Sequence, residues 1–374
     1  MAGRERNEEG RTATPLELFF DLVFVVAVAF AASALHHDVA DGIVGESIVH
    51  YAQVFFAIWW AWMNFTWFAS AYDTDDIPYR VTIFVGITGA LTLAAGIPDA
   101  FAVGDYTIVT IGYVVMRLAL VTLWLRAARE DPTHARTARR FAAGVSTAQI
   151  GWVLLLFVPG SLALFGFLVL VIVELAVPIW AESAAPTDWH REHIVERYGL
   201  FTIIVLGESI LASSIAIQSV MGEVATEIDL VLIIVGGLLT VFSMWWLYFA
   251  RPSHDLLTSV RRAFIWGYGH YFVWAAAAAV GAGLAIAIDH ATGHGLIGDL
   301  GAGAAVAVPA ASYVLALWVL HYLPRGEGIA ANIRAPIAAF LILLTPLTGQ
   351  SVLLTGLILT GLLASKLLST RRLA

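Results

Sequence analysis

The chain has 374 residues, of which 60% are hydrophobic and only 13% are charged. A soluble domain carries about 25% charged residues, so this chain has too little polar surface to coat a globule of its size. Most of its surface is therefore expected to face lipid. The absence of cysteine excludes thiolate chemistry, and a net charge of −8 gives no basic patch for nucleic acid. No phosphate loop, nucleophile elbow or diagnostic set of metal ligands is present, so no cofactor or metal is predicted.

Twelve apolar runs predict an all-α, polytopic transmembrane helical bundle, since a spanning helix takes roughly 20 mainly apolar residues. The runs fall near residues 16–36, 44–70, 79–98, 106–126, 141–158, 162–180, 198–218, 228–250, 264–288, 302–322, 333–347 and 351–368. The last two are short and contain Pro336 and Pro346. They could form a hairpin that does not fully cross.

The cationic residues orient this bundle. Nineteen of the twenty Lys and Arg residues fall on the termini and on alternate loops: Arg4, Arg6, Arg11, Arg80, Arg126, Arg129, Arg136, Arg139, Arg140, Arg191, Arg197, Arg251, Arg261, Arg262, Arg325, Arg334, Lys366, Arg371 and Arg372. The cation-rich side of a membrane protein faces the cytoplasm, so both termini are predicted to be cytoplasmic. The exception is Arg117, in the middle of the fourth segment.

The chain is predicted to consist of a cytoplasmic tail, residues 1–15, and a single transmembrane domain, residues 16–374. Acidic residues within the first segment argue against a cleaved signal peptide. Short similarities between segments 1 and 7, 2 and 8, and 4 and 10 occur in the same order. They indicate a six-plus-six internal repeat with halves of about 16–180 and 190–368, related by an axis along the membrane normal.

Of the charged side chains in the predicted spans, five are singled out as intramembrane: Glu17, Asp21, Arg117, Glu174 and Glu208. A charge at the centre of a bilayer costs about 2.5–3.5 kcal/mol on insertion scales, so each one needs a reason. Their estimated depths overlap, with Glu208 near the midplane. We therefore expect Asp21, Arg117, Glu174 and Glu208 to meet in one polar centre.

Arg117 is expected to pair with Glu208 or Glu174. The centre would then be rich in acid, and one carboxyl would be a proton or cation site unless His270 or a bound solute supplies a charge. Structural roles compete with this interpretation. Glu17 suits a helix cap or an anchor, Asp21 a hydrogen bond between helices, and Arg117 an internal counter-ion.

Smaller and aromatic residues supplement this centre. Gly207 predicts a close helix approach beside Glu208, and Ser209 adds a hydroxyl that is often bonded to its own backbone. A tryptophan group favours an interfacial belt over a cavity wall for a cation or flat solute. Its members are Trp59, Trp60, Trp62 and Trp67 on the second segment and Trp245 and Trp246 on the eighth, with Tyr248 beside them.

Two longer motifs resemble those of a known family. The stretch Pro15-Leu16-Glu17-Leu18-Phe19-Phe20-Asp21-Leu22-Val23-Phe24-Val25 is similar to the opening signature of the bacterial low temperature requirement A (LtrA) family. The stretch Glu196-Arg197-Tyr198-Gly199-Leu200-Phe201-Thr202-Ile203-Ile204-Val205-Leu206-Gly207-Glu208-Ser209-Ile210 resembles its central signature. The resemblance implies a bacterial inner-membrane protein and no defined chemistry. It adds Glu196 and Arg197 to the candidate residues.

Three functions fit these observations. The first is a secondary transporter of a small solute or ion, coupled to protons through the buried carboxylates. The second is a membrane-embedded enzyme acting on a lipid or isoprenoid, which would need an acid and a nucleophile within hydrogen-bond reach. The third is a sensor or accessory subunit with structural charges, which predicts a dry and fully paired core.

Overall fold

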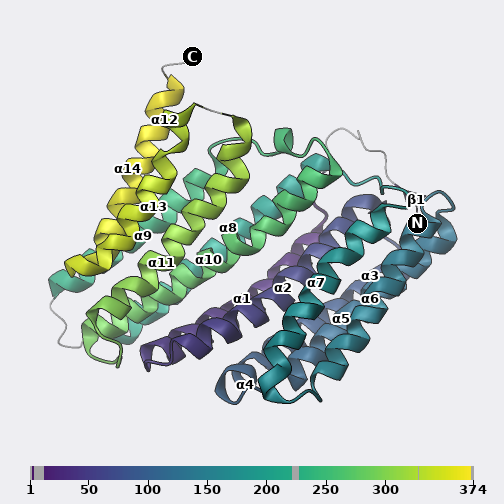
Figure 1. The fold of residues 1–374 in the computed structure, drawn as a ribbon, viewed down its shortest axis with the longest axis horizontal. Helices are drawn as coiled ribbons and strands as arrows, with labels where there is room; N and C mark the ends of the chain where they lie inside the picture. The colour runs from purple at the N-terminus through teal and green to yellow at the C-terminus, as the bar shows by residue number, and fades with distance from the viewer. Residues whose placement is uncertain (1, 4–11, 221–226, 327, 372–374) are drawn as a thin grey trace. The chain divides into compact units, whose positions relative to one another are not determined.

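The computed structural model describes residues 2–3, 12–220, 227–326 and 328–371, and these are almost entirely helical (Figure 1). The α-helices are α1 (Pro15–Ala40), α2 (Gly45–Ala71), α3 (Ile77–Ala95), α4 (Ile97–Ala102), α5 (Thr107–Glu130), α6 (Ala135–Leu155), α7 (Gly160–Glu182), α8 (Arg191–Val220), α9 (Glu227–Phe249), α10 (Val260–Thr292), α11 (Asp299–Leu317), α12 (Ile329–Asn332), α13 (Arg334–Leu344) and α14 (Ser351–Arg371). Two strands of two residues each, β1 (Ala2–Gly3) and β2 (Tyr72–Asp73), pair antiparallel.

Each predicted apolar segment coincides with a helix, which confirms the all-α, multi-pass architecture. Among the described residues, nine helices are long and apolar enough to cross a membrane. Two more, α2 and α6, have 27 and 21 residues but a lower hydropathy. Four tryptophans and Asn64 lower it in α2, and the arginines of its first turns do so in α6.

The chain forms two compact units, which are described separately. Unit 1 comprises Met1–Phe30 and Gln53–Tyr198, and unit 2 comprises Ala31–Ala52 and Gly199–Ala374. Helices α1, α2 and α8 therefore contribute residues to both. The internal six-plus-six repeat and its halves stay a prediction.

In unit 1, α3 and α5 pack with their backbones in contact. A Cβ added at Gly112 would lie 2.2 Å from the Leu93 nitrogen, and one at Gly89 would lie 2.8 Å from the Gly112 oxygen. Only residues without a side chain allow this approach, as is typical of membrane helices. The close pair holds α5 firmly against its neighbour, and α5 carries Arg117.

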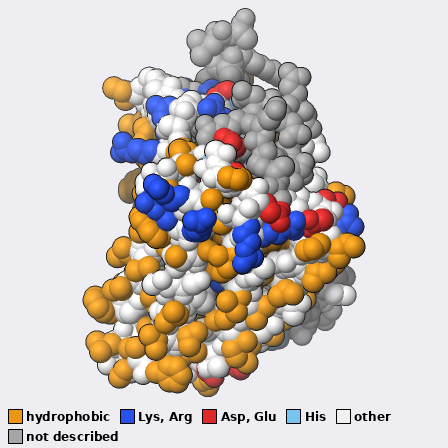
Figure 2. Space-filling model, turned by 90° about the vertical axis from the view of Figure 1, so that its right-hand side faces the viewer, with side chains coloured by type: hydrophobic (Ala, Val, Ile, Leu, Met, Phe, Trp, Pro, Cys, Tyr) orange, Lys and Arg blue, Asp and Glu red, His pale blue; other side chains and the backbone are white. Residues whose placement is uncertain are grey.

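Three connections of unit 1 meet at one end of its helices. The Tyr72 hydroxyl lies 3.4 Å from Asp131 Oδ2, Arg126 donates to Asp76, and Thr137 donates to the Ala185 oxygen at 2.7 Å. These are loops that the cation pattern places on one side. On the face drawn in Figure 2, Lys and Arg side chains gather in a band above a largely hydrophobic surface.

In unit 2, glycines again allow close helix contacts. A Cβ at Gly236 of α9 would lie 2.6 Å from the Leu353 backbone of α14, and one at Gly283 of α10 would lie 2.1 Å from the Ala305 oxygen of α11. A π-helical turn, Trp318–Tyr322, continues α11. Small residues therefore join α9 to α14 and α10 to α11.

The two last segments differ in length. Helix α13 has 11 residues and spans about 16 Å, less than the roughly 30 Å of a bilayer core. Helix α14 has 21 residues, about 31 Å, and lies beside α13 (Figure 1). The prediction of a short segment is therefore correct for α13, which ends in a 3₁₀ turn at Thr345–Thr348, and wrong for α14.

Candidate functional site

A carboxylate with four donors lies inside unit 1, and we call its five residues the Glu174 cluster. Arg117 Nη2 of α5 and Trp60 Nε1 of α2 donate to Glu174 Oε2 at 2.7 and 2.9 Å. The Tyr113 hydroxyl and Trp152 Nε1 of α6 donate to Oε1 at 3.0 and 3.1 Å. Glu174, on α7, is fully buried and Arg117 is 1% exposed. Four helices thus converge on one acid.

This arrangement suits an ionised carboxylate. A carboxylate only accepts hydrogen bonds, and all four neighbours of Glu174 are donors. Arg117 adds a charge-assisted bond and makes the pair neutral overall. A neutral, hydrogen-bonded pair costs far less to hold in a membrane than either charge alone.

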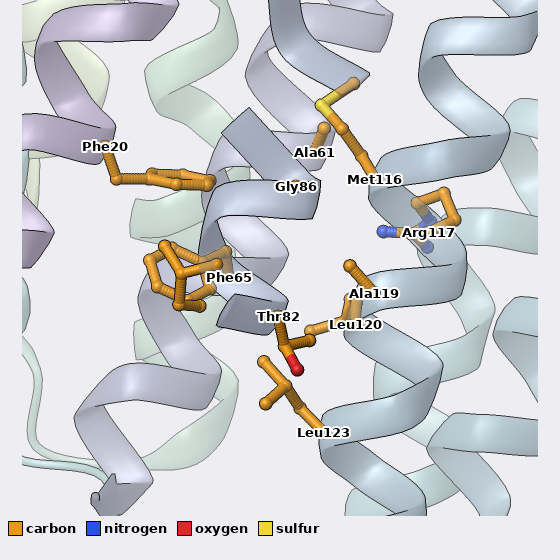
Figure 3. Close-up of a pocket in the computed structure, with 11 residues that line it drawn as sticks. Phe20, Ala61, Phe65, Thr82, Gly86, Met116, Arg117, Ala119, Leu120 and Leu123 are labelled. Atoms are coloured by element: carbon orange, nitrogen blue, oxygen red, sulfur yellow. The ribbon is translucent and has the colours of Figure 1, made fainter. Parts of the chain in front are cut away.

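Arg117 itself is not fully satisfied. Its Nε and Nη1 atoms are buried, and within the described part of the chain neither has a hydrogen-bond partner. Arg117 borders a cavity of about 20 Å³, which we call the small cavity, with Phe20 and Phe65 at the opposite side (Figure 3). That volume holds about one water molecule. The guanidinium group therefore has room for a partner that is not protein.

A second space, the large cavity, has a volume of about 240 Å³. Tyr113 and Trp152 form part of its wall, together with Phe56 and Phe167. Along α5 the large cavity extends over residues 107–113, and the small cavity begins at Met116. The Glu174 cluster consequently lies between the two.

A second buried ion pair, the Asp21 cluster, lies elsewhere in unit 1. Arg197 grips Asp21 with two bonds, Nε to Oδ2 at 2.9 Å and Nη2 to Oδ1 at 2.6 Å. Trp62 Nε1 donates to Oδ1 at 2.7 Å. Arg197 Nη1 and His193 Nε2 each lie 3.1 Å from Glu17 Oε1. Asp21, His193 and Arg197 are fully buried.

Glu17 also caps α1. The Thr14 nitrogen donates to Glu17 Oε2 at 2.7 Å, and the Glu17 nitrogen donates to Thr14 Oγ1 at 3.3 Å. With Pro15 as the first helical residue, this is a capping box. The structure therefore supports the expectation that Glu17 acts as a cap, and it adds an ion pair to that role.

The structure brings some predicted residues together as expected and others differently. Arg117 pairs with Glu174, one of the two partners expected for it. Arg197 was counted among the cations between the sixth and seventh segments. Helix α8 begins at Arg191, so Arg197 lies inside the helix, where it donates to Asp21. Of the two arginines assigned to the connection between the sixth and seventh segments, Arg191 and Arg197, the second is therefore paired with Asp21.

Glu208 belongs to unit 2 and is about half buried. Within the described residues its carboxylate has no ion pair, so a single centre that joins it to Asp21, Arg117 and Glu174 stays a prediction.

The close approach expected at Gly207 is wrong, since a Cβ there would meet no described atom within 4 Å. The contact lies instead at Ser209, whose Oγ donates to Ala277 O at 3.0 Å against Gly281. Residues 207 and 209 point to opposite sides of a helix.

The aromatic candidates divide into two kinds. Trp59 and Trp60 are buried in unit 1, so the belt interpretation is wrong for them, and Trp60 serves Glu174. Trp245 and Trp246 are 45% and 48% exposed, as a belt requires.

Two further supporting residues lie at other positions. His270 contacts the Tyr248 hydroxyl at 3.0 Å and the Trp266 oxygen at 2.7 Å. Glu196 accepts from the Ala13 nitrogen at 3.1 Å.

The residues missed from the sequence are mostly hydrogen-bond donors. Tyr113, Trp152 and His193 contact buried carboxylates, and Trp62, which was named only as a member of the aromatic group, donates to Asp21. Tyr113 precedes Arg117 by one helical turn, and His193 precedes Arg197 by one turn. Each pair therefore shares a helix face, and this spacing is the signal that could have identified them.

Comparison with known proteins agrees with the signatures. A family model described as the bacterial low temperature requirement A protein (LtrA) matches residues 12–368, nearly the whole chain. One similar protein is an uncharacterized protein of Rhizobium meliloti (strain 1021). It is 30% identical over 284 residues, which cover 71% of this chain and 67% of that protein. This multi-pass membrane protein belongs to the LtrA family.

Proposed function

We propose that this member of the LtrA family is a proton-coupled secondary transporter of a small solute in a bacterial inner membrane, with both termini cytoplasmic. One observation carries the proposal: a buried, neutral Arg–Glu pair belongs to a cluster that lies between two cavities, and two other side chains of this cluster form part of the wall of the larger cavity. A pair of this kind can change partners when a solute arrives, because the solute or water can replace a lost hydrogen bond.

The alternatives are less well supported. A purely structural core would be dry and fully paired, whereas Arg117 keeps two unsatisfied nitrogens beside a cavity. A membrane enzyme would need a nucleophile beside its acid. Within the described residues the hydrogen-bond partners of Glu174 are Arg, Tyr and Trp side chains, none of which is a hydroxyl nucleophile of the Ser or Thr type.

We assign the proton to Glu208. Within the described residues this half-buried carboxyl has no fixed cation, whereas Asp21 and Glu174 each have an arginine. A carboxyl without a counter-ion gains and loses a proton at a lower electrostatic cost than one locked in a pair.

The test is solid-supported membrane electrophysiology on proteoliposomes. A panel of small cationic, neutral and anionic solutes is applied to the wild type, Glu174→Gln, Glu208→Gln and the control Glu46→Gln, whose side chain is 73% exposed. We expect a solute to evoke a current in the wild type and the control. Glu174→Gln should abolish it, and Glu208→Gln should abolish proton coupling but keep solute exchange. Equal currents in all four proteins, or none for any solute in the wild type, would overturn the proposal.

A further inference from the structure

The large cavity has an aromatic wall built by four helices. Phe56 comes from α2, Tyr113 from α5, Trp152 from α6 and Phe167 from α7. Their rings stand close together, with centroids 5.8 Å apart for Phe56 and Phe167, 5.3 Å for Trp152 and Phe167, and 6.1 Å for Tyr113 and Trp152. The polar tips of Tyr113 and Trp152 are turned to Glu174. What these two residues offer to the cavity is therefore mainly their rings.

The charge near this cavity is negative. Asp105 belongs to its lining and is exposed. Hydrogen bonds from Thr107 lower the pKa of Asp105, so the carboxylate is ionised at neutral pH. The connections 99–106 and 156–163, which supply much of the rim, contain Asp99 and Asp105 and no Lys, Arg or His. A cation is attracted to such a mouth and an anion is repelled.

We infer that the large cavity binds a small organic cation, an ammonium group that carries a compact apolar body. Such a group is attracted to the faces of aromatic rings, and Asp105 complements its charge. The apolar lining, including Leu155, Leu156 and Ala163, accommodates the body. The volume is many times that of one water site, so a molecule of several heavy atoms fits. The inference rests on the proposed function in one respect, since it names the substrate class of that transporter.

The same geometry links the ligand to the buried pair. Tyr113 and Trp152 contact the cavity on one side and donate to Glu174 on the other. A cation that draws either ring toward itself removes a donor from Glu174. The second acceptor oxygen of Glu174 then becomes available to the cation, and Arg117 keeps its own bond to Oε2.

The test is calorimetric titration of the full-length protein in nanodiscs with three probes of one shape and different charge. These are choline, its neutral carbon isostere 3,3-dimethyl-1-butanol, and the anion 3,3-dimethylbutanoate. Choline should bind at least about tenfold more tightly than the neutral isostere, which is the size of one or two cation–π contacts. The anion should show no saturable binding. Equal affinity for the three probes, or no binding of choline, would contradict the cation site.

Matched variants locate the site. Phe167→Leu removes one ring of the wall and keeps an apolar side chain, and Asp105→Asn removes the rim charge. Both should weaken choline binding by about 3- to 30-fold. Phe165→Leu and Glu46→Gln change exposed residues outside the lining and should not alter it. Equal losses in variants and controls would exclude this cavity. So would native mass spectrometry that shows a bound phospholipid which choline does not displace.

The outcomes separate the two proposals. Saturable choline binding without any solute-evoked current would contradict transport and leave the cation site standing. Currents with neutral or anionic solutes, together with no choline binding, would contradict the cation site and leave transport standing.

Discussion

The Asp21 cluster and the Glu174 cluster each hold a buried acid beside an arginine, but their surroundings differ. Each pairs one acid with one arginine at membrane depth, and each recruits a tryptophan N–H as a further donor. The Asp21 pair is bidentate, and none of its cluster lines either cavity. The Glu174 pair has one bond from Arg117, which borders the small cavity, while Tyr113 and Trp152 of the same cluster border the large one. We propose that the first cluster is a structural brace and that the second belongs to the transport site.

The brace also connects segments that are distant in sequence. Asp21 and Glu17 lie in α1, and His193 and Arg197 lie in α8, about 170 residues later. Glu17, Asp21 and Arg197 lie in the two stretches that resemble LtrA signatures, so the family resemblance and the ion pair share these three residues. The comparison of the two clusters indicates that a buried charge is a stronger sign of function when a cavity lies beside its cluster.

Breaking the brace should have the largest effect. Asp21→Asn removes the carboxylate that accepts two bonds from the buried Arg197 and leaves Arg197 with its contact to Glu17 at 3.1 Å. Removing one partner of a buried pair costs about 3–5 kcal/mol. We expect a large fall in the thermal midpoint measured in detergent by intrinsic fluorescence. The double variant Asp21→Leu/Arg197→Met, which removes both charges, should recover most of that loss. A midpoint for Asp21→Asn equal to that of the wild type would refute the bracing role.

The equivalent change in the other cluster should cost less. Glu174→Gln leaves Arg117 without a charged partner, but water in the small cavity can reach the guanidinium group. We expect a loss of about 1–3 kcal/mol in the free energy of unfolding, together with loss of solute-evoked current. Chemical denaturation of both amide variants in the same detergent makes the comparison. A loss for Glu174→Gln as large as that for Asp21→Asn would remove the distinction between brace and site.

The cap on α1 should have a smaller effect. Thr14→Ala removes the hydroxyl that accepts from the Glu17 nitrogen, and the loss of such a cap costs about 1 kcal/mol. Glu17 keeps its contacts with His193 and Arg197. We therefore expect a lower thermal midpoint with unchanged solute-evoked current. Thr14→Ser, which keeps the hydroxyl, is the control and should behave like the wild type.

The smallest effect is expected outside the membrane helices, at Asp76. Arg126 and the Tyr79 nitrogen donate to Asp76, and they hold its pKa well below the usual range. A carboxyl with a lowered folded pKa stabilises the protein above its unfolded pKa of about 4. That stability is lost as the pH falls through the folded value. The difference in thermal midpoint between the wild type and Asp76→Asn should thus shrink as the pH is lowered from 5 toward 2. A difference that stays constant over this range would contradict the ion pair.

Much of the fold was predictable because a lipid bilayer imposes the same requirements on every helix that crosses it. A bilayer demands helices of a certain length and apolar surface, and this demand is local in sequence. The twelve segments could therefore be located without tertiary information.

The sequence allowed us to predict which charged residues belong to the candidate site, but not which of them pair with each other. The cost of burying a charge selects Asp21, Arg117, Glu174 and Glu208 directly from the sequence. Which acid meets which arginine depends on helix rotation and packing. Arg197 shows the difference, since it reads as a loop cation and becomes the partner of Asp21 only when α8 extends back to Arg191.

The sequence by itself determined the class of protein, the position of its helices and the identity of its buried charges, because these follow from the free energy of transfer into lipid. Tertiary structure alone decided that Tyr113, Trp60 and Trp152 converge on Glu174 and that the small cavity borders its arginine. Hydrogen bonds between helices require side chains that are far apart in sequence to meet within about 3 Å. Only the packing of the helices against each other, through close contacts such as Gly112 on Leu93, brings them to that distance.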